Sequence, residues 1–113
     1  MSASLLIKLA DLVFDVSADD DLTNVIDGVG EAISIAIYSP AAAPVGTIGV
    51  EVAPDSDSVA ADFRPLFSNG SAVTLPQNSC TVITASGYSK LRLTSDGTEN
   101  ADLTYVVRAQ TRT

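Results

Sequence analysis

The sequence predicts an all-β protein, a single antiparallel β-sandwich with a jelly-roll-like arrangement of about eight strands. Three observations lead to this fold class. Short apolar runs alternate with polar residues, which is the period of a half-buried strand. Gly, Pro, Asn and Asp separate these runs at short intervals. Eleven of the 14 acidic residues are Asp, which favours turns, and only three are Glu, which favours helices.

The beginning of the chain admits more than one structure. Residues 5–16 fit a strand, because apolar residues alternate both before and after Asp11. They also fit an amphipathic helix, because Leu5, Leu9, Leu12 and Val16 recur at spacings of four, three and four. The strand is favoured because the rest of the chain is β and because Val and Phe prefer a pleated surface. Alternatively, the acidic residues 1–31 leave the sandwich as an arm that docks on a neighbouring subunit.

The remaining elements follow as short strands. The clearest alternation lies in residues 32–38, where three Ile residues share one face, and residues 46–53 form the next run. In residues 62–67, Pro65 predicts an edge strand or a bulge. Three Phe residues are assigned to the core, namely Phe14, Phe63 and Phe67. Further strands are expected at residues 72–75, 81–85, 90–95 and 101–109, with a tight turn at Ser68-Asn69-Gly70 before the first of them.

Length and charge limit the classes of function. The 113 residues fit one domain over residues 1–113, with one core. The net charge is −8, and residues 1–31 hold seven acids and one Lys. Because this charge opposes contact with phosphates and anionic lipids, neither nucleic acid nor a membrane is expected as a partner. Lys8 ends the first apolar run too early for the core of an export signal, and no run reaches the roughly 18 apolar residues of a membrane span.

Common catalytic chemistry lacks its usual residues. The chain has no His and a single cysteine, Cys80, which is expected to be a small buried residue within a strand. Residues 55–58 with Asp62 have a partial likeness to a calcium loop, but they lack the Gly and the final Glu of the EF-hand pattern. We therefore expect no catalytic residue, no cofactor and no metal, and the protein is not expected to be an enzyme.

Charged residues instead suggest contacts between proteins. Asp19, Asp20 and Asp21 are expected to form a solvated loop whose adjacent side chains point in different directions. If the strands at 90–95 and 101–109 pair, Lys90 and Arg92 share a face with Arg108, opposite the acidic segment of a second copy. The candidate interface residues are therefore Asp19, Asp20, Asp21, Lys90, Arg92, Arg108 and Arg112.

Four segments from residue 32 onward carry a resemblance to a known class of proteins. They are Ile48-Gly49-Val50-Glu51-Val52-Ala53-Pro54-Asp55, Phe63-Arg64-Pro65-Leu66, Gly70-Ser71-Ala72-Val73-Thr74-Leu75-Pro76, and Tyr88-Ser89-Lys90-Leu91-Arg92-Leu93-Thr94-Ser95-Asp96-Gly97. With them the chain resembles small virion proteins of tailed bacteriophages, above all capsid decoration (cement) proteins. The resemblance implies a jelly roll that binds the outer capsid surface as a dimer or trimer. There it would stabilise contacts between subunits of the major capsid protein.

Two other roles remain open at this stage. A receptor- or glycan-binding module of a tail fibre would present aromatic or carboxylate side chains on loops at one end of the sandwich. A tail or neck connector protein would form a ring instead of covering the capsid. Both would share the β-sandwich, so the fold alone does not separate them from a decoration protein.

Overall fold

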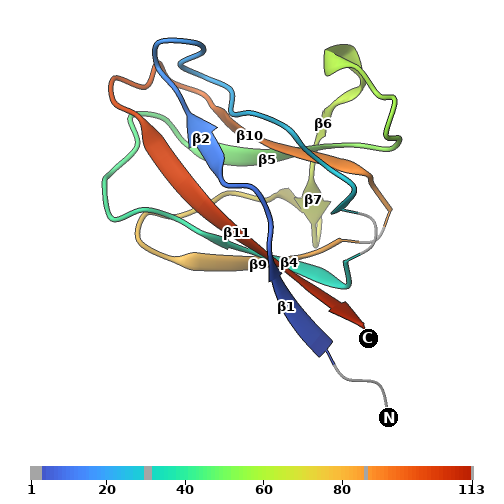
Figure 1. The fold of residues 1–113 in the computed structure, drawn as a ribbon. Coiled ribbons are helices and arrows are strands. Elements are labelled where there is room, and N and C mark those ends of the chain that lie inside the picture. Colours follow the sequence, from blue (N-terminus) through green and yellow to red (C-terminus); the bar gives the residue numbers. More distant parts are fainter. Residues whose placement is uncertain (1–3, 30–31, 86, 113) are drawn as a thin grey trace.

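Two antiparallel β-sheets face each other and enclose one core (Figure 1). The computed structural model describes residues 4–29, 32–85 and 87–112. These residues form eleven strands and one 3-10 helix, η2 (Ala60–Asp62). Within these ranges, no helix has the length and apolar character needed to cross a membrane. The all-β expectation is confirmed, and the helix alternative for residues 5–16 is wrong.

The first sheet has the strand order β1-β11-β4-β9, and β2 also pairs with β11. Every neighbouring pair in it is antiparallel. Its strands are β1 (Ser4–Lys8), β2 (Leu12–Phe14), β4 (Ser34–Tyr38), β9 (Cys80–Thr84) and β11 (Leu103–Arg112). The strands expected at 32–38, 81–85 and 101–109 are β4, β9 and β11.

The second sheet has the order β3-β10-β5-β6. Pro65 lies in β6, at the edge of this sheet, where its missing N–H interrupts no ladder. A hairpin of β7 and β8 follows, and its turn residues Asn69 and Gly70 have φ angles of 54° and 81°, as a type I′ turn requires. The strands of the second sheet and the hairpin are β3 (Ile26–Asp27), β5 (Ile48–Ala53), β6 (Arg64–Pro65), β7 (Phe67–Ser68), β8 (Ser71–Ala72) and β10 (Lys90–Ser95).

A β-bulge explains the ambiguous pattern at the start of the chain. Lys8 pairs with Arg108 and Leu12 pairs with Tyr105, so the first segment advances four residues while β11 advances three. The extra residue changes which alternate positions face the core, and Leu12 is fully buried as a result. Both β1 and β2 pair with β11 of the same chain, and β3 pairs with β10.

The core is built from the inward faces of both sheets. Ile35, Ile37 and Val107 of the first sheet are fully buried against Leu91 and Leu93 of the second. Burying each such aliphatic side chain stabilises the fold by about 1.5–3 kcal/mol before conformational entropy is subtracted. These are the positions that the alternation of apolar and polar residues predicts.

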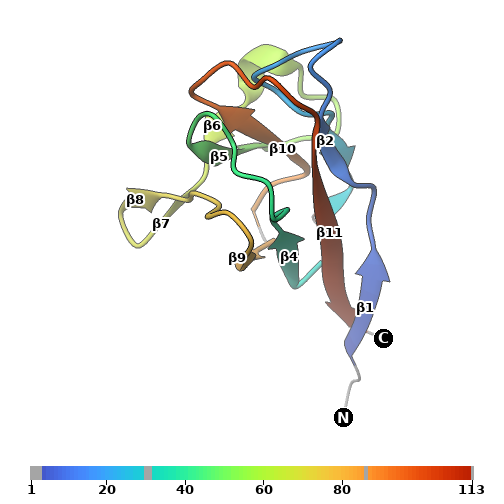
Figure 2. The ribbon, with the colours of Figure 1, turned by 90° about the vertical axis from the view of Figure 1, so that its left-hand side faces the viewer.

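Two expected core residues lie on the surface instead. Phe67 is 60% exposed because the β7–β8 hairpin stands away from the two sheets, at the left of Figure 2. Cys80 is also exposed, since it begins β9 on the face that points away from the core. Ile83 is the buried residue of that strand. Placing Phe67 and Cys80 in the core was therefore wrong.

Candidate interaction surfaces

The basic residues expected to share one face are divided between the two sheets. Lys90 and Arg92 lie on β10 in the second sheet, whereas Arg108 lies on β11 in the first. Because the two strands belong to different sheets, they do not pair. Their apolar faces meet across the core instead. Their cations consequently point away from the core on opposite sides of the sandwich. The expected grouping was therefore wrong. Arg112 ends β11, and its side chain lies outside the described part.

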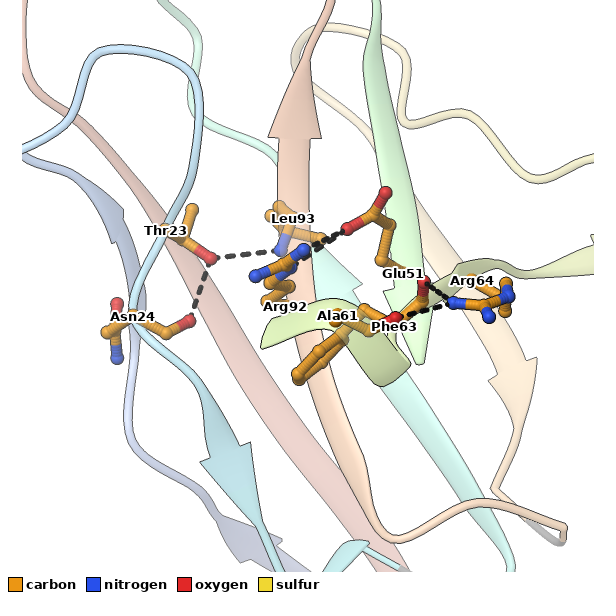
Figure 3. A network of polar contacts seen from close by, with 8 residues as sticks. All are labelled: Thr23, Asn24, Glu51, Ala61, Phe63, Arg64, Arg92 and Leu93. Carbon is orange, nitrogen blue, oxygen red and sulfur yellow. Dashed lines mark hydrogen bonds and ion pairs between the residues drawn. The ribbon is translucent and has the colours of Figure 1, made fainter. Parts of the chain in front are cut away.

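Arg92 is held within its own chain (Figure 3). Its Nη2 lies 2.7 Å from Oε1 of Glu51, and its Nε donates to the same oxygen at 2.8 Å. The guanidinium carbon also lies 4.1 Å above the centre of the Phe63 ring. Glu51 and Arg92 are direct partners in the β5–β10 register, so the pair forms across two strands. Arg92 therefore stabilises the outer face of the second sheet, and most of its side chain is covered there.

The other cations of this sheet bind main-chain oxygens. Nη1 of Arg64 donates to the carbonyl oxygens of Ala61 at 2.8 Å and Phe63 at 2.9 Å (Figure 3). Nζ of Lys90 donates to the carbonyl oxygen of Ser58 at 3.0 Å. All three acceptors lie in the segment that carries η2. The cations thus hold this segment against β6 and β10.

The segment with a partial likeness to a calcium loop uses its polar groups to close turns. Oγ of Ser58 accepts a hydrogen bond from the N–H of Asp55 at 3.0 Å. The Asp62 carboxylate accepts one from the N–H of Val59 at 2.8 Å. These are the local side-chain bonds expected of Asp and Ser in turns.

The three consecutive Asp residues do converge, contrary to expectation. A turn closed by bonds from the N–H groups of Ala18 and Asp19 to the carbonyl oxygen of Asp15 precedes them. One carboxylate oxygen from each of Asp19, Asp20 and Asp21 lies within 4.8 Å of the others. Hydrogen bonds from Asp21 lower the pKa of Asp19, whereas the same contact and burial raise the pKa of Asp21. Three carboxylates are fewer than the six to eight oxygens that Ca²⁺ takes.

Main-chain bonds fix this acidic loop to the second sheet. The N–H of Ser95 donates to the carbonyl oxygen of Asp21 at 2.9 Å, and that of Glu99 to Asp20 at 3.2 Å. Further along, Oγ1 of Thr23 accepts a hydrogen bond from the N–H of Leu93 at 2.9 Å (Figure 3). The loop therefore presents negative charge in a defined place, at the end of β10.

Glu99 is a buried carboxylate that no sequence pattern indicates. It is 4% exposed, and it accepts hydrogen bonds from the N–H groups of Val45 and Gly46, each at 2.9 Å, and from Oγ of Ser95 at 2.7 Å. Burial alone would raise its pKa, but these bonds outweigh burial and hold the pKa below the ordinary 4.5. Burial, with a smaller contribution from the Glu99 charge, raises the pKa of Tyr105 to about 12. The carboxylate joins its own loop to the loop before β5 and to the last residue of β10, so its role is structural.

The outer face of the first sheet has a different character. Its exposed apolar residues include Tyr38 and Val82, at 45% and 65% exposure. Lys8 and Arg108 are neighbours in the register and supply its charge. Within the strands, none of the described side chains on this face is acidic. They are Lys8, Val13, Ser34, Ala36, Tyr38, Cys80, Val82, Thr84, Thr104, Val106, Arg108 and Gln110.

A groove opens between the free edge of β9 and the β7–β8 hairpin, and its volume is about 570 Å³. Leu66 and Phe67 form one wall, and Val82 and Ile83 form the other. Val52, Val73 and Tyr88 also contribute, and no lining residue carries a charge at neutral pH. The groove can therefore accept an uncharged segment.

Comparison with known proteins identifies no relative. No family model, curated protein or solved structure matches the chain. What the chain does must therefore be inferred from its own sandwich, its charges and its exposed apolar residues.

Proposed function

We propose that this chain is a structural virion protein of a tailed bacteriophage. It binds the outer surface of the capsid, as a dimer or trimer, and stabilises contacts between subunits of the major capsid protein. It does this by binding alone, without catalysis and without a cofactor. Its partners are the capsid protein and further copies of itself. The proposal extends the sequence resemblance, and one observation on the fold carries it.

That observation is the order of the strands in the two sheets. We count β1 with β2 as the first strand and β6 to β8 as the fifth. The first sheet then runs first, eighth, third, sixth, and the second runs second, seventh, fourth, fifth. This order supports a jelly roll, in which two Greek keys wind together and which recurs in viral capsid proteins and lectins.

The distribution of charge supports a binding role with a defined orientation. The acidic loop of Asp19, Asp20 and Asp21 lies at one end of the second sheet, whereas the described outward-facing residues within the strands of the first sheet carry only basic charges. Two unlike surfaces allow a small subunit to bind in one orientation. We place the contact with a basic stretch of the capsid protein at the acidic loop.

A reconstitution experiment tests the proposal. The purified chain is mixed with expanded capsids of the bacteriophage that encodes it. We expect saturable binding at a copy number set by the capsid lattice, together with resistance of the capsids to heat. If the wild-type chain does not bind these capsids, the proposed function is wrong.

A matched pair of variants tests the position of the contact. The double variant D20N/D21N removes two charges from the acidic loop, and D55N/D57N removes two from an exposed turn elsewhere. We expect only D20N/D21N to weaken binding, and we expect added salt to reduce the difference. Equal effects of the two variants would place the contact elsewhere.

A receptor- or glycan-binding module is the second candidate. The observation that favours it is Phe67, an exposed aromatic ring beside the groove. This role predicts that the isolated chain binds host cells and that Phe67→Ala abolishes the binding, whereas capsids remain bare. Micrographs of virions would separate these two roles from that of a neck connector. A decoration protein would lie on the capsid, a receptor-binding module at the tail tip, and a connector in a ring at the neck.

A further inference from the structure

Strand β9 leaves one of its two edges without a partner. Its other edge pairs with β4. Just before β9, the N–H of Ser39 donates to the carbonyl oxygen of Ser79 at 2.7 Å, which fixes which residues of β9 bond to β4. Because antiparallel bonds alternate along a strand, the N–H groups of Cys80, Val82 and Thr84 point to the free side. No main-chain bond among the described residues reaches them there. Of the carbonyl oxygens on that side, the one of Thr84 accepts a hydrogen bond from the hydroxyl of Tyr88 at 2.7 Å, and its second lone pair stays available to a further strand.

The other edges of the two sandwich sheets are protected against pairing with another chain. Edge strand β6 contains Arg64 and Pro65, the edge formed by β1 and β2 contains Lys8 and a bulge, and β3 is only two residues long. By contrast, the five residues of β9 include no charge, no proline and no bulge. Such an edge is a template for a further strand.

The charge distribution favours a second copy of the chain as the partner. Two chains of net charge −8 repel each other over most of their surface. Neither β9 nor the lining of the adjacent groove carries a charged side chain, and the described strand residues of the neighbouring outer face carry only the charges of Lys8 and Arg108. Two copies thus meet with least repulsion at this edge. The exposed apolar residues Val82 and Phe67 lie beside it.

We propose that two copies associate through their β9 edges, antiparallel about a two-fold axis at Val82. The two first sheets then form one continuous sheet, and the same surface is used by both copies. Val82 lies opposite Val82 of the second copy, and Cys80 lies opposite Thr84. The two grooves come to lie beside each other beneath the joined sheet, which covers Phe67. This specifies the self-association within the proposed function, but it rests on the geometry of the β9 edge and on the charge distribution, and it holds whether or not the chain binds capsids.

Sedimentation of the wild-type chain and two variants at increasing concentration tests the association. Val82→Lys places two ammonium groups across the axis, and we expect the dissociation constant of the dimer to rise about tenfold or more. Val59→Lys is the control, because Val59 is 63% exposed, close to the 65% of Val82, but lies beside η2. A wild-type chain that remains monomeric, or an equal effect of both variants, would overturn the proposal.

A cysteine pair tests the register without altering the core. In the proposed pairing, residue 84 lies opposite Cys80 of the second copy, with Cα atoms about 5.5 Å apart, within disulfide range. We expect Thr84→Cys to form disulfide-linked dimers in oxidised glutathione. Wild type and C80S/T84C are the controls, since their single cysteines lie four strand positions apart, about 13 Å, across the axis. If Thr84→Cys forms no more linked dimer than these controls, the register is wrong.

Discussion

Replacing Glu99 with Gln tests whether a buried anion joins the loops at one end of the sandwich. The carboxylate accepts three hydrogen bonds, from the N–H groups of Val45 and Gly46 and from Oγ of Ser95. Gln keeps the shape, but its NH₂ group must face one of these donors, and the remaining bonds lose their charge. A hydrogen bond to a charged group contributes about 1.5–3 kcal/mol, and a buried donor without a partner costs about 1–3 kcal/mol. We therefore expect Glu99→Gln to lower the free energy of unfolding by about 2–4 kcal/mol.

The pH dependence of this loss has a definite sign. The pKa of Glu99 is lower in the folded chain than its ordinary 4.5, so the ionised form favours folding. Its contribution is complete above the pKa of the unfolded chain and disappears as the pH falls through the folded pKa. The difference between wild type and Glu99→Gln should therefore be largest at neutral pH and should shrink as the pH falls below 4.5.

Urea unfolding followed by circular dichroism measures this difference at neutral pH and at several acidic pH values. Asp57→Asn is the control, because Asp57 is an exposed acid and its replacement should leave the unfolding midpoint nearly unchanged at neutral pH. Two results would refute the reasoning about Glu99. One is a Gln variant as stable as the wild type, and the other is a loss that does not change with pH.

Three further predictions concern the fold. Arg92→Met removes the bond to Glu51 and the stacking on Phe63, so we expect the free energy of unfolding in urea to fall by about 1–2 kcal/mol. The same replacement should cost less in a chain that already carries Glu51→Gln, and an unchanged midpoint would contradict this. Gly46→Ala places a Cβ against the N–H of Gly97 and Oγ of Ser95, so a loss above about 2 kcal/mol is expected, whereas Gly70→Ala, with open space around it, meets no clash but is strained by its φ of 81°. Burial raises the pKa of Tyr88 and of Tyr105 to about 12, so both should stay protonated above pH 10, and their contribution to stability should be lost as the pH rises from 10 towards 12; absorbance titration of the tyrosines would contradict this if all of them ionised together near pH 10.

Local patterns predicted most of the strands. Alternating apolar residues placed β4 and β10, and Pro65 placed an edge, because each signal depends only on neighbouring residues. The Asn69-Gly70 turn was equally clear, since few residues adopt its positive φ angles. At the start of the chain the two halves of the pattern were visible, but the bulge that joins them depends on pairing with β11.

The candidate surfaces were predicted less well, because they depend on contacts between distant segments. Alternation shows that β10 and β11 each have an apolar face, but it does not show whether they pair or oppose each other. For the same reason, the sequence wrongly grouped Arg92 with Arg108 and gave no signal for the burial of Glu99. The sequence by itself determined which segments are strands and where they turn, since these are local preferences of the backbone. Only the tertiary structure decided which charges are paired and which sheet edge is open, because burial and strand pairing involve the whole chain.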